Sequence, residues 1–229
     1  MLKDLDNQFK SLVLICTTVK YNFITIEGNI GAGKTTLSKI LSEYYGAKLI
    51  LEEFADNPFL PDFYKNPAQY AFPLELFFMA ERYKQLSEML QSRDMFQQIT
   101  ISDYLFKKSL LFAKVNLPEQ EYRLYQKLFD IINPQIIQPD ILIYLHAPVD
   151  KLKENIKKRN RSYEQNIDPQ YLHNLQDIYS AFIKQHNIKT LFVDASEADF
   201  VNNPNHLKII TEALEQDWQE GPNYICLNK

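Results

Sequence analysis

Apolar residues recur along the chain with two different periods. Short apolar or alternating runs predict strands at about residues 21–27, 48–51, 98–102, 140–145 and 190–193. Apolar residues at helical spacing predict helices over about residues 34–45, 70–91, 104–113, 120–137, 149–158, 169–186 and 205–217. Because strands and helices alternate, we expect an α/β fold, a three-layer sandwich whose central parallel sheet of about five strands is flanked by helices. Ligands bind such sheets beyond the carboxyl ends of the strands.

The length of the chain bounds the number of domains. A chain of 229 residues with 45% hydrophobic content can bury one substantial core, so we expect a single domain over residues 21–229. Residues 1–20 precede the first predicted strand. Their pattern leaves three interpretations open: a partly helical extension, an edge strand, or the product of an upstream start codon.

The composition of the chain limits which binding partners and which cellular compartment we expect. A net charge of −4 and a pI near 5.6 provide no basic field for duplex nucleic acid. The two cysteines, Cys16 and Cys226, form no CxxC or His/Cys cluster, which fits a reducing cytoplasm. The apolar segment at residues 11–18 is too short to span a bilayer. We therefore expect a soluble cytoplasmic protein with small-molecule partners and neither nucleic acid nor membrane among them.

One glycine-rich segment carries a specific phosphate-binding signal. It fits GxxxxGK[ST], lies between a predicted strand and a predicted helix, and comprises Gly28, Asn29, Ile30, Gly31, Ala32, Gly33, Lys34 and Thr35, with Thr36 next to it. Glycines let successive N–H groups point at phosphate oxygens, and the following helix adds the positive end of its dipole. Lys34 is expected to reach the β- and γ-phosphates, and the Thr35 hydroxyl to bind Mg²⁺. The segment predicts a P-loop NTPase-like protein that binds a nucleoside triphosphate with Mg²⁺, and alone it leaves kinases, GTPases, ATPases and motors open. The family resemblance described below implies ATP as that nucleotide.

Two carboxylates, Glu52 and Glu53, follow the second predicted strand. At the carboxyl end of that strand, one helix and one strand after the P-loop, a general base can face the γ-phosphate. A solvated acidic strand end is the alternative interpretation.

The segment 63–86 combines a turn with an unusually aromatic helix. Glu75 and Arg82 are seven residues apart, two turns along one face that also carries aromatic residues. An acid and a base on an apolar face suggest a pocket in which rings stack a nucleobase and polar groups read its edge. Alternatively, Glu75 and Arg82 form a surface ion pair beside a row of apolar residues that packs in the core.

A basic turn lies between two predicted helices at residues 157–165 (KKRNRSYEQ). Arg159 and Arg161 are candidates for a lid, near residues 158–166, that closes over the phosphates and neutralises the transferred group. A solvated helix end would have the same composition.

Together these segments resemble the deoxynucleoside kinase family, of the deoxyguanosine, deoxyadenosine and deoxycytidine kinase type. The resemblance runs from about residue 21 to 195 and rests on IEGNIGAGKTTL, EExxxNP, FYKNPxxYAFPLE and RNRSYE. It implies that Glu52 is the catalytic base, although Glu53 replaces the usual proline and leaves a one-residue slip open. It also implies that Tyr64 and Glu164 contact the sugar hydroxyl and that the lid arginines are Arg159 and Arg161.

The residue expected to read the base departs from the family. Glu75 stands where relatives have glutamine, and an ionised glutamate only accepts hydrogen bonds. An acceptor suits guanine, or the amino group of cytosine or adenine, better than thymine. Arg82 matches the arginine of deoxycytidine and purine kinases. Alternatively, Glu75 pairs with Arg82 and neither contacts the base.

A second departure lies at the end of the third strand. The family's ERS or DRS motif is here Ser102-Asp103-Tyr104, so the arginine that supports the substrate's 5′ end and the phosphates is absent. Asp103 remains a candidate Mg²⁺ ligand, directly or through water. Unless another cation compensates, phosphoryl transfer would be weakened.

The resemblance implies ATP-dependent phosphorylation of the 5′-hydroxyl of a deoxynucleoside in nucleotide salvage, by a homodimer. A purine or deoxycytidine is favoured over thymidine. Two alternatives stay open: a nucleoside monophosphate kinase such as a thymidylate kinase, and a degenerate member that binds nucleotide without catalysis.

Overall fold

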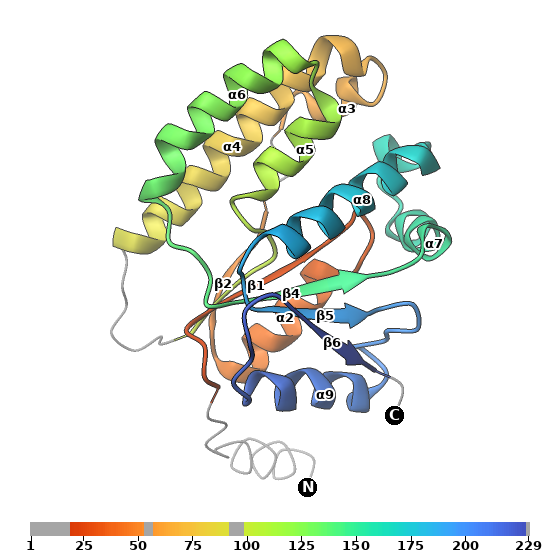
Figure 1. The fold of residues 1–229 in the computed structure, drawn as a ribbon. Coiled ribbons are helices and arrows are strands. Elements are labelled where there is room, and N and C mark those ends of the chain that lie inside the picture. Colours follow the sequence, from red (N-terminus) through yellow and green to blue (C-terminus); the bar gives the residue numbers. More distant parts are fainter. Residues whose placement is uncertain (1–18, 53–56, 92–98, 228–229) are drawn as a thin grey trace, which may run out of the picture.

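The computed structural model describes residues 19–52, 57–91 and 99–227. Its centre is one sheet in which every strand runs parallel to its neighbours, in the order β2-β3-β1-β4-β5-β6 (Figure 1). The strands are β1 (Phe23–Gly28), β2 (Lys48–Ile50), β3 (Thr100–Ser102), β4 (Ile141–His146), β5 (Thr190–Asp194) and β6 (Pro222–Cys226). The predicted α/β class with a parallel sheet is confirmed.

Helices cover both faces of this sheet. They are α2 (Lys34–Tyr45), α3 (Leu60–Phe63), α4 (Pro67–Gln91), α5 (Lys108–Asn116), α6 (Glu119–Ile132), α7 (Val149–Arg159), α8 (Pro169–Gln185) and α9 (Pro204–Leu214), with 3-10 turns η1 (Asn133–Gln135) and η2 (Ser162–Glu164). Alternate residues of β4 enter different cores. Ile143 packs with residues of α2 and α9, whereas Tyr144 packs with residues of α5 and α8. The period of two along the strand therefore gives the molecule its three layers.

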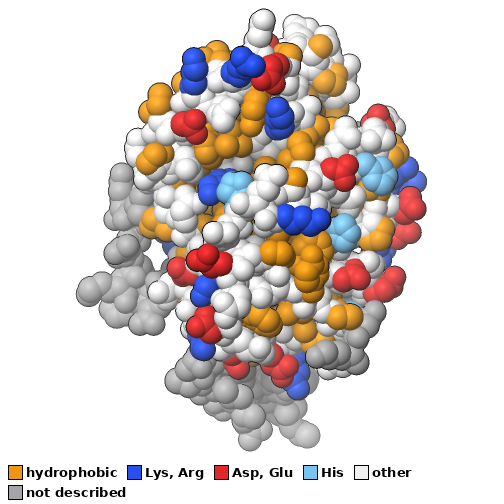
Figure 2. Space-filling model, in the orientation of Figure 1, with side chains coloured by type: hydrophobic (Ala, Val, Ile, Leu, Met, Phe, Trp, Pro, Cys, Tyr) orange, Lys and Arg blue, Asp and Glu red, His pale blue; other side chains and the backbone are white. Residues whose placement is uncertain are grey.

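A third core lies among the outer helices and reaches the sheet at Phe23 of β1 and Ile50 of β2. Helices α3, α4, α5 and α6 bury an aromatic-rich cluster that includes Phe63, Phe78, Tyr125 and Phe129. Figure 1 shows α4, α5 and α6 stacked beyond the sheet, on the side that α8 covers. On the face drawn in Figure 2, basic side chains are scattered among acidic ones.

The structure corrects three details of the predicted elements. The sheet has a sixth strand, β6, which the pattern did not indicate; it is a short edge strand, and none of its residues is fully buried. Helix α5 begins at Lys108 instead of Tyr104, because the Leu105 N–H donates to the buried Glu27 carboxylate (2.9 Å) and diverts the chain. The helix predicted over 120–137 ends at Ile132 and is followed by η1. The three interpretations of residues 1–20 concern a segment that lies almost wholly outside the described residues.

The order of the strands places the candidate site. Strand β1 is central, and the chain leaves it to form β2 and β3 on one side and β4 to β6 on the other. This reversal is a switch point, where neighbouring connections diverge and leave a crevice at the carboxyl ends of the strands. The glycine-rich loop follows β1 directly into that crevice.

Candidate active site

The loop between β1 and α2 is held tightly against helix α7. Gly31 has a φ of 83°, and a Cβ there would lie 2.7 Å from the Leu152 carbonyl oxygen. Asn155 Nδ2 also donates to the Gly31 carbonyl (2.9 Å). Glycine is required because the backbone is left-handed and two elements approach closely.

Lys34 turns its side chain back toward the loop. Its Nζ donates to the carbonyls of Gly28 and Asn29, both at 3.0 Å. Burial and then the nearby Lys108 lower the pKa of Lys34 to about 8. The carbonyls hold the ammonium at the point where phosphates would arrive.

Two hollows meet at the loop; we call them the donor hollow and the acceptor hollow after the phosphoryl donor and acceptor that the sequence resemblance implies. The donor hollow is lined by Gly31, Ala32, Gly33, Lys34, Thr35, Thr36, Asn155, Lys158, Arg159, Arg161, Ala195, Ala198, Asp199, Phe200 and Val201. The acceptor hollow is lined by Ile30, Lys34, Glu52, Leu60, Phe63, Tyr64, Leu74, Glu75, Phe78, Arg82, Lys108, Phe112, Asn116, Arg159, Arg161, Glu164 and Tyr171. Three cationic residues line both: Lys34, Arg159 and Arg161. Of the predicted P-loop residues, Gly28 and Asn29 line neither hollow and instead hold Lys34.

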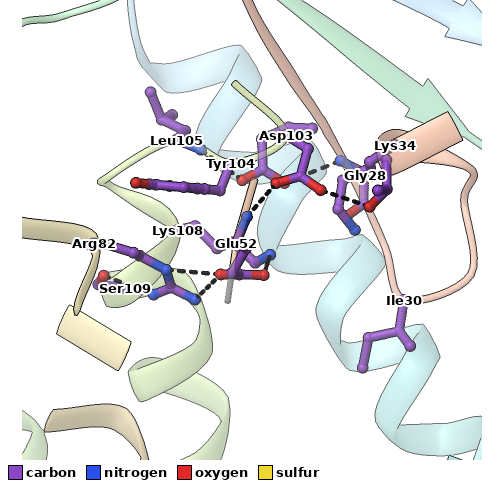
Figure 3. A network of polar contacts seen from close by, with 12 residues as sticks. Gly28, Ile30, Lys34, Glu52, Arg82, Asp103, Tyr104, Leu105, Lys108 and Ser109 are labelled. Atoms are coloured by element: carbon purple, nitrogen blue, oxygen red, sulfur yellow. Dashed lines mark hydrogen bonds and ion pairs between the residues drawn. The ribbon is translucent and has the colours of Figure 1, made fainter. Parts of the chain in front are cut away.

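Glu52 lies at the centre of a buried charge network, just beyond the end of β2. Arg82 donates to its Oε1 from Nε (2.8 Å) and Nη2 (2.5 Å), and Lys108 Nζ donates to its Oε2 (2.8 Å) (Figure 3). Burial alone would raise the pKa of Glu52, but the charges of Lys108 and Arg82 outweigh it and lower the pKa to about 2. The carboxylate is therefore ionised and fixed. Glu53, the alternative base, lies outside the described residues.

Asp103 connects this network to the P-loop. Its Oδ1 accepts from the Glu52 N–H (2.7 Å), and its Oδ2 accepts from Thr35 Oγ1 (2.5 Å). Burial raises the pKa of Asp103. The two predicted metal ligands, Thr35 and Asp103, are thus in direct contact, next to the carboxylate of the network.

Glu75 lies on the wall of the acceptor hollow with one oxygen unused. Its side chain is 1% exposed; Oε1 accepts from Asn116 Nδ2 (2.6 Å), and Oε2 is buried without a hydrogen-bond partner among the described residues. Burial raises the pKa of Glu75 to about 7, against the opposing charge of Arg82. Arg82 is equally buried and bonds Glu52 and Ser109 (Nη1 to Oγ, 2.7 Å). The interpretation of these two residues as a surface ion pair is therefore wrong.

The basic turn after α7 folds over the hollows. Arg159 and Arg161 both donate to the buried carboxylate of Glu164, Arg161 at 3.2 Å. About a third of each arginine side chain is exposed. Tyr163 of this turn stacks on Tyr64, with ring centroids 6.0 Å apart. Burial and then the charge of Glu164 raise the pKa of Tyr64, so its hydroxyl stays protonated. The turn thus joins Tyr64 and Glu164 at one side of the acceptor hollow.

Sequence reasoning missed Lys108, Asn116 and Ser109. The first lies beside another lysine in KKSLLFAKVN, and no pattern distinguishes the buried Lys108 from the half-buried Lys107. Asn116 ends α5, where an asparagine is ordinary. Only the packing of α5 against α4 brings these side chains to Glu52 and Glu75.

A P-loop at the switch point of a parallel sheet, beside a second hollow with a buried carboxylate, defines a P-loop phosphotransferase of small acceptors. The chain belongs to the deoxynucleoside kinase family, whose model matches residues 24–217, and it is a deoxynucleoside kinase.

Individual relatives agree with this assignment. Deoxyguanosine kinase from Bacillus subtilis is 36% identical over 199 residues, covering 85% of this chain and 96% of that protein. Deoxyadenosine kinase from Lactobacillus acidophilus is 30% identical, covering 87% of this chain and 98% of that protein. The structure of deoxyadenosine kinase from M. mycoides with bound dATP is similar, with a TM-score of 0.74 and 27% identity, over 85% of this chain and all of that one. Within residues 19–52, 57–91 and 99–227, no helix is long and apolar enough to cross a membrane.

Proposed function

We propose that this kinase transfers the γ-phosphoryl group of MgATP to the 5′-hydroxyl of a purine deoxynucleoside, with deoxyguanosine preferred and thymidine the poorest acceptor. The observation that carries the base preference is Glu75 Oε2 on the wall of the acceptor hollow, which is buried and has no hydrogen-bond partner among the described residues. The deoxyguanosine kinase of B. subtilis, at 36% identity, supports it.

The reaction joins the contents of the two hollows. A bond forms between the 5′-oxygen and the γ-phosphorus, the bond from that phosphorus to the β–γ bridging oxygen breaks, ADP leaves, and the hydroxyl proton passes to Glu52. The three cations shared by both hollows, Lys34, Arg159 and Arg161, stabilise the negative charge on the group in transfer. Of the predicted P-loop residues, Gly31 to Thr36 line the donor hollow and are proposed to hold the ATP phosphates, while Gly28 and Asn29 hold Lys34.

Glu52 acts chiefly by orienting the acceptor hydroxyl. A strong general base has a pKa near the working pH, whereas Lys108 and Arg82 hold that of Glu52 near 2. A loose phosphoryl-transfer transition state needs positioning more than proton abstraction. A fixed carboxylate that accepts a hydrogen bond from the 5′-hydroxyl meets that need.

The residues present fit Mg²⁺. In nucleotide sites Mg²⁺ takes one or two protein oxygens beside phosphate oxygens and water, and the Thr35 hydroxyl and Asp103 carboxylate supply such a pair. When bound, the ion would neutralise charge on the phosphates. Thr35 and Asp103 are the residues proposed to hold it.

Glu75 is proposed to read the Watson–Crick edge of the base. Guanine presents two adjacent donors, N1–H and N2–H₂, which an ionised carboxylate can accept, whereas thymine presents only N3–H between two acceptors. The contact of Asn116 with Oε1 holds the carboxylate in place. A buried acceptor left unpaired costs about 1–3 kcal/mol, so a base that satisfies it is favoured.

The sugar contacts involve the lid. Tyr64 and Glu164, which the turn after α7 brings to one side of the hollow, are proposed to bind the 3′-hydroxyl. A closed pocket that gives a 2′-hydroxyl no partner would disfavour ribose.

The ion pairs of two cations in the acceptor hollow disfavour a nucleoside monophosphate kinase. An acceptor phosphate would need free positive charge, but Arg82 and Lys108 are both engaged by Glu52. A degenerate, non-catalytic member is disfavoured because the charge network around Glu52 is complete.

The test is a panel of the four deoxynucleosides with MgATP, followed by detection of the monophosphate. We expect deoxyguanosine to be phosphorylated fastest. The matched variant Glu75→Gln, which restores a donor and an acceptor, should lower kcat/KM for deoxyguanosine relative to deoxyadenosine by ~10- to 100-fold. Turnover of nucleotides but not nucleosides would support the monophosphate kinase instead, and thymidine as the best acceptor would refute the role of Glu75.

We also propose that the enzyme is a homodimer that serves nucleotide salvage in the cytoplasm. Leu124 and Ile131 are large apolar side chains exposed on α6, 52% and 68% respectively, and burying them between two copies would be favourable. Light scattering of the purified protein tests the dimer; a monomer at micromolar concentration would contradict it.

A further inference from the structure

We propose that Lys108 is the positioning residue that holds the Glu52 carboxylate for the acceptor hydroxyl, in place of the arginine expected at position 104. This inference rests on the proposed function, because it assigns a further residue of the same site.

Position 104 supplies no charge to the site. Tyr104 is fully buried, and its hydroxyl donates to Gln85 Oε1 (2.8 Å). Figure 3 shows its ring extending away from the Glu52 carboxylate. The residue packs in the core beneath α4, so the side chain that follows Asp103 is structural.

Lys108 brings a cation to the carboxylate from a different position. It is the first residue of α5, its side chain is 5% exposed, and its Nζ donates to Glu52 Oε2 (2.8 Å). The Nζ lies 5.3 Å from the centroid of the Phe112 ring, one turn further along α5. The helix start and this ring contact fix the direction of the lysine.

The two partners of Glu52 divide its oxygens between them. Arg82 occupies Oε1 and is anchored by Ser109, whereas Lys108 is the one described residue that donates to Oε2. An acceptor that approaches Oε2 therefore meets the Lys108 ammonium as well. Because an ammonium has three donors, Lys108 can keep its bond to Glu52 while another of its protons faces the 5′-oxygen.

The charges around Lys108 point to a role beyond stabilising the fold. One cation would neutralise Glu52, yet two flank it, and Lys34 lines the same hollow. Lys108 is the largest charge that lowers the pKa of Lys34, so the two ammonium groups repel each other. The carboxylates of Glu27, Glu52 and Asp103 offset part of this repulsion, because their charges raise the pKa of Lys34. An anionic phosphoryl group between the two ammonium groups would reduce it further.

The experiment compares Lys108→Met and Lys108→Arg with the adjacent control Lys107→Met, which removes a half-buried lysine that does not line the hollow. We expect Lys108→Met to lower kcat ~100-fold or more while KM for ATP changes less than ~3-fold. Lys108→Arg should recover kcat to within ~10-fold of wild type, and Lys107→Met should match wild type.

A second measurement needs no turnover. Wild type should bind deoxyguanosine at least ~10-fold more tightly than 2′,5′-dideoxyguanosine, because only the first offers a 5′-hydroxyl to Glu52; in Lys108→Met the two affinities should become equal within ~2-fold. If Lys108→Met does not fold, as thermal unfolding would reveal, Lys108→Gln takes its place in both measurements.

Full kcat in the folded variant, or an unchanged preference for the 5′-hydroxyl, would overturn the role of Lys108. Failure of wild type to phosphorylate any deoxynucleoside would refute the proposed function instead. The binding comparison still decides the role of Lys108 in that case.

Discussion

The donor and acceptor hollows of this kinase adjoin, but they are constructed differently. The donor hollow rests on backbone: one loop of glycines, the first turn of α2 and the close approach of Gly31 to α7. The acceptor hollow rests on charged side chains that come from the segment after β2, from α4 and α5, and from the end of α7 and the turn after it. A site made of local backbone tolerates little change of shape, whereas a site made of distant side chains can change its chemistry one residue at a time.

The largest effect is expected when Glu52, the centre of the buried charge network, is replaced. Glu52→Gln deletes the orienting carboxylate and leaves Arg82 and Lys108 without their anion, so kcat should fall by ~10³-fold. Affinity for ATP, measured by titration calorimetry, should stay within ~3-fold because the P-loop is intact. The neighbouring Glu53→Gln is the control and should retain activity. If Glu53→Gln is the inactive variant, the base has been assigned one residue too early.

A smaller effect is expected in the donor hollow. Gly31→Ala places a Cβ against the Leu152 carbonyl at a φ of 83°, at a cost of ~1–3 kcal/mol. We expect KM for ATP to rise ~10- to 100-fold, with a lower melting temperature. Gly46→Ala is the control: it introduces the same left-handed strain, at the end of α2, with no atom within 4 Å of the new Cβ. Gly46→Ala should lower the melting temperature and leave KM unchanged. Equal KM values in both variants would mean that the contact of the loop with α7 is dispensable.

The smallest expected effect is a dependence of base preference on pH. Burial raises the pKa of Glu75 to about 7. Above that pH the carboxylate is ionised and accepts from guanine; below it the protonated group offers a donor and an acceptor, which suits adenine or cytosine. The ratio of kcat/KM for deoxyguanosine to that for deoxyadenosine should therefore rise up to ~10-fold between about pH 6 and about pH 8.5.

This titration has to be separated from those of its surroundings. The charged and titratable groups near Glu75, from every element packed around it, are Glu52, Arg82, Lys108, Tyr125 and Tyr171. The ratio of kcat/KM values for the two acceptors cancels those effects of pH that are common to both reactions. Glu75→Gln, which does not titrate, should give a ratio independent of pH. A ratio that still changes with pH in this variant would assign the effect to another group.

The two hollows also differ in how far the sequence could predict them. The loop from Gly28 to Thr36 was recognisable because a local backbone conformation demands residues at fixed spacing. Glu52, Glu75 and Arg82 were recognisable as candidates from strand position and helical spacing, but only the family resemblance chose between their functional and structural interpretations. Lys108 and Asn116 were not recognisable, because their roles arise when α5 packs on α4, and neither residue type is unusual in a helix.

The same reasoning explains the outcome for the fold. Alternating apolar runs predicted β1 and β4 well, since both are buried on two faces. Strand β6 was missed because its residues are stabilised by pairing with β5 and leave Tyr224 70% exposed. The start of α5 was misplaced because a buried carboxylate, Glu27, holds the preceding backbone, and such a long-range bond leaves no periodic signal.

Helix α4 carries both Glu75 and Arg82, two turns apart, and this has a consequence for how such enzymes evolve. If Glu75 reads the base as proposed, one helix connects the choice of base to the anchoring of Glu52, and sliding or rotating that helix to gain a new substrate would cost rate. Substrate range would then change through substitutions of single side chains on a helix that keeps its position. Attempts to redesign the acceptor preference would do best to vary position 75 and its partner Asn116 and to leave the helix where it lies.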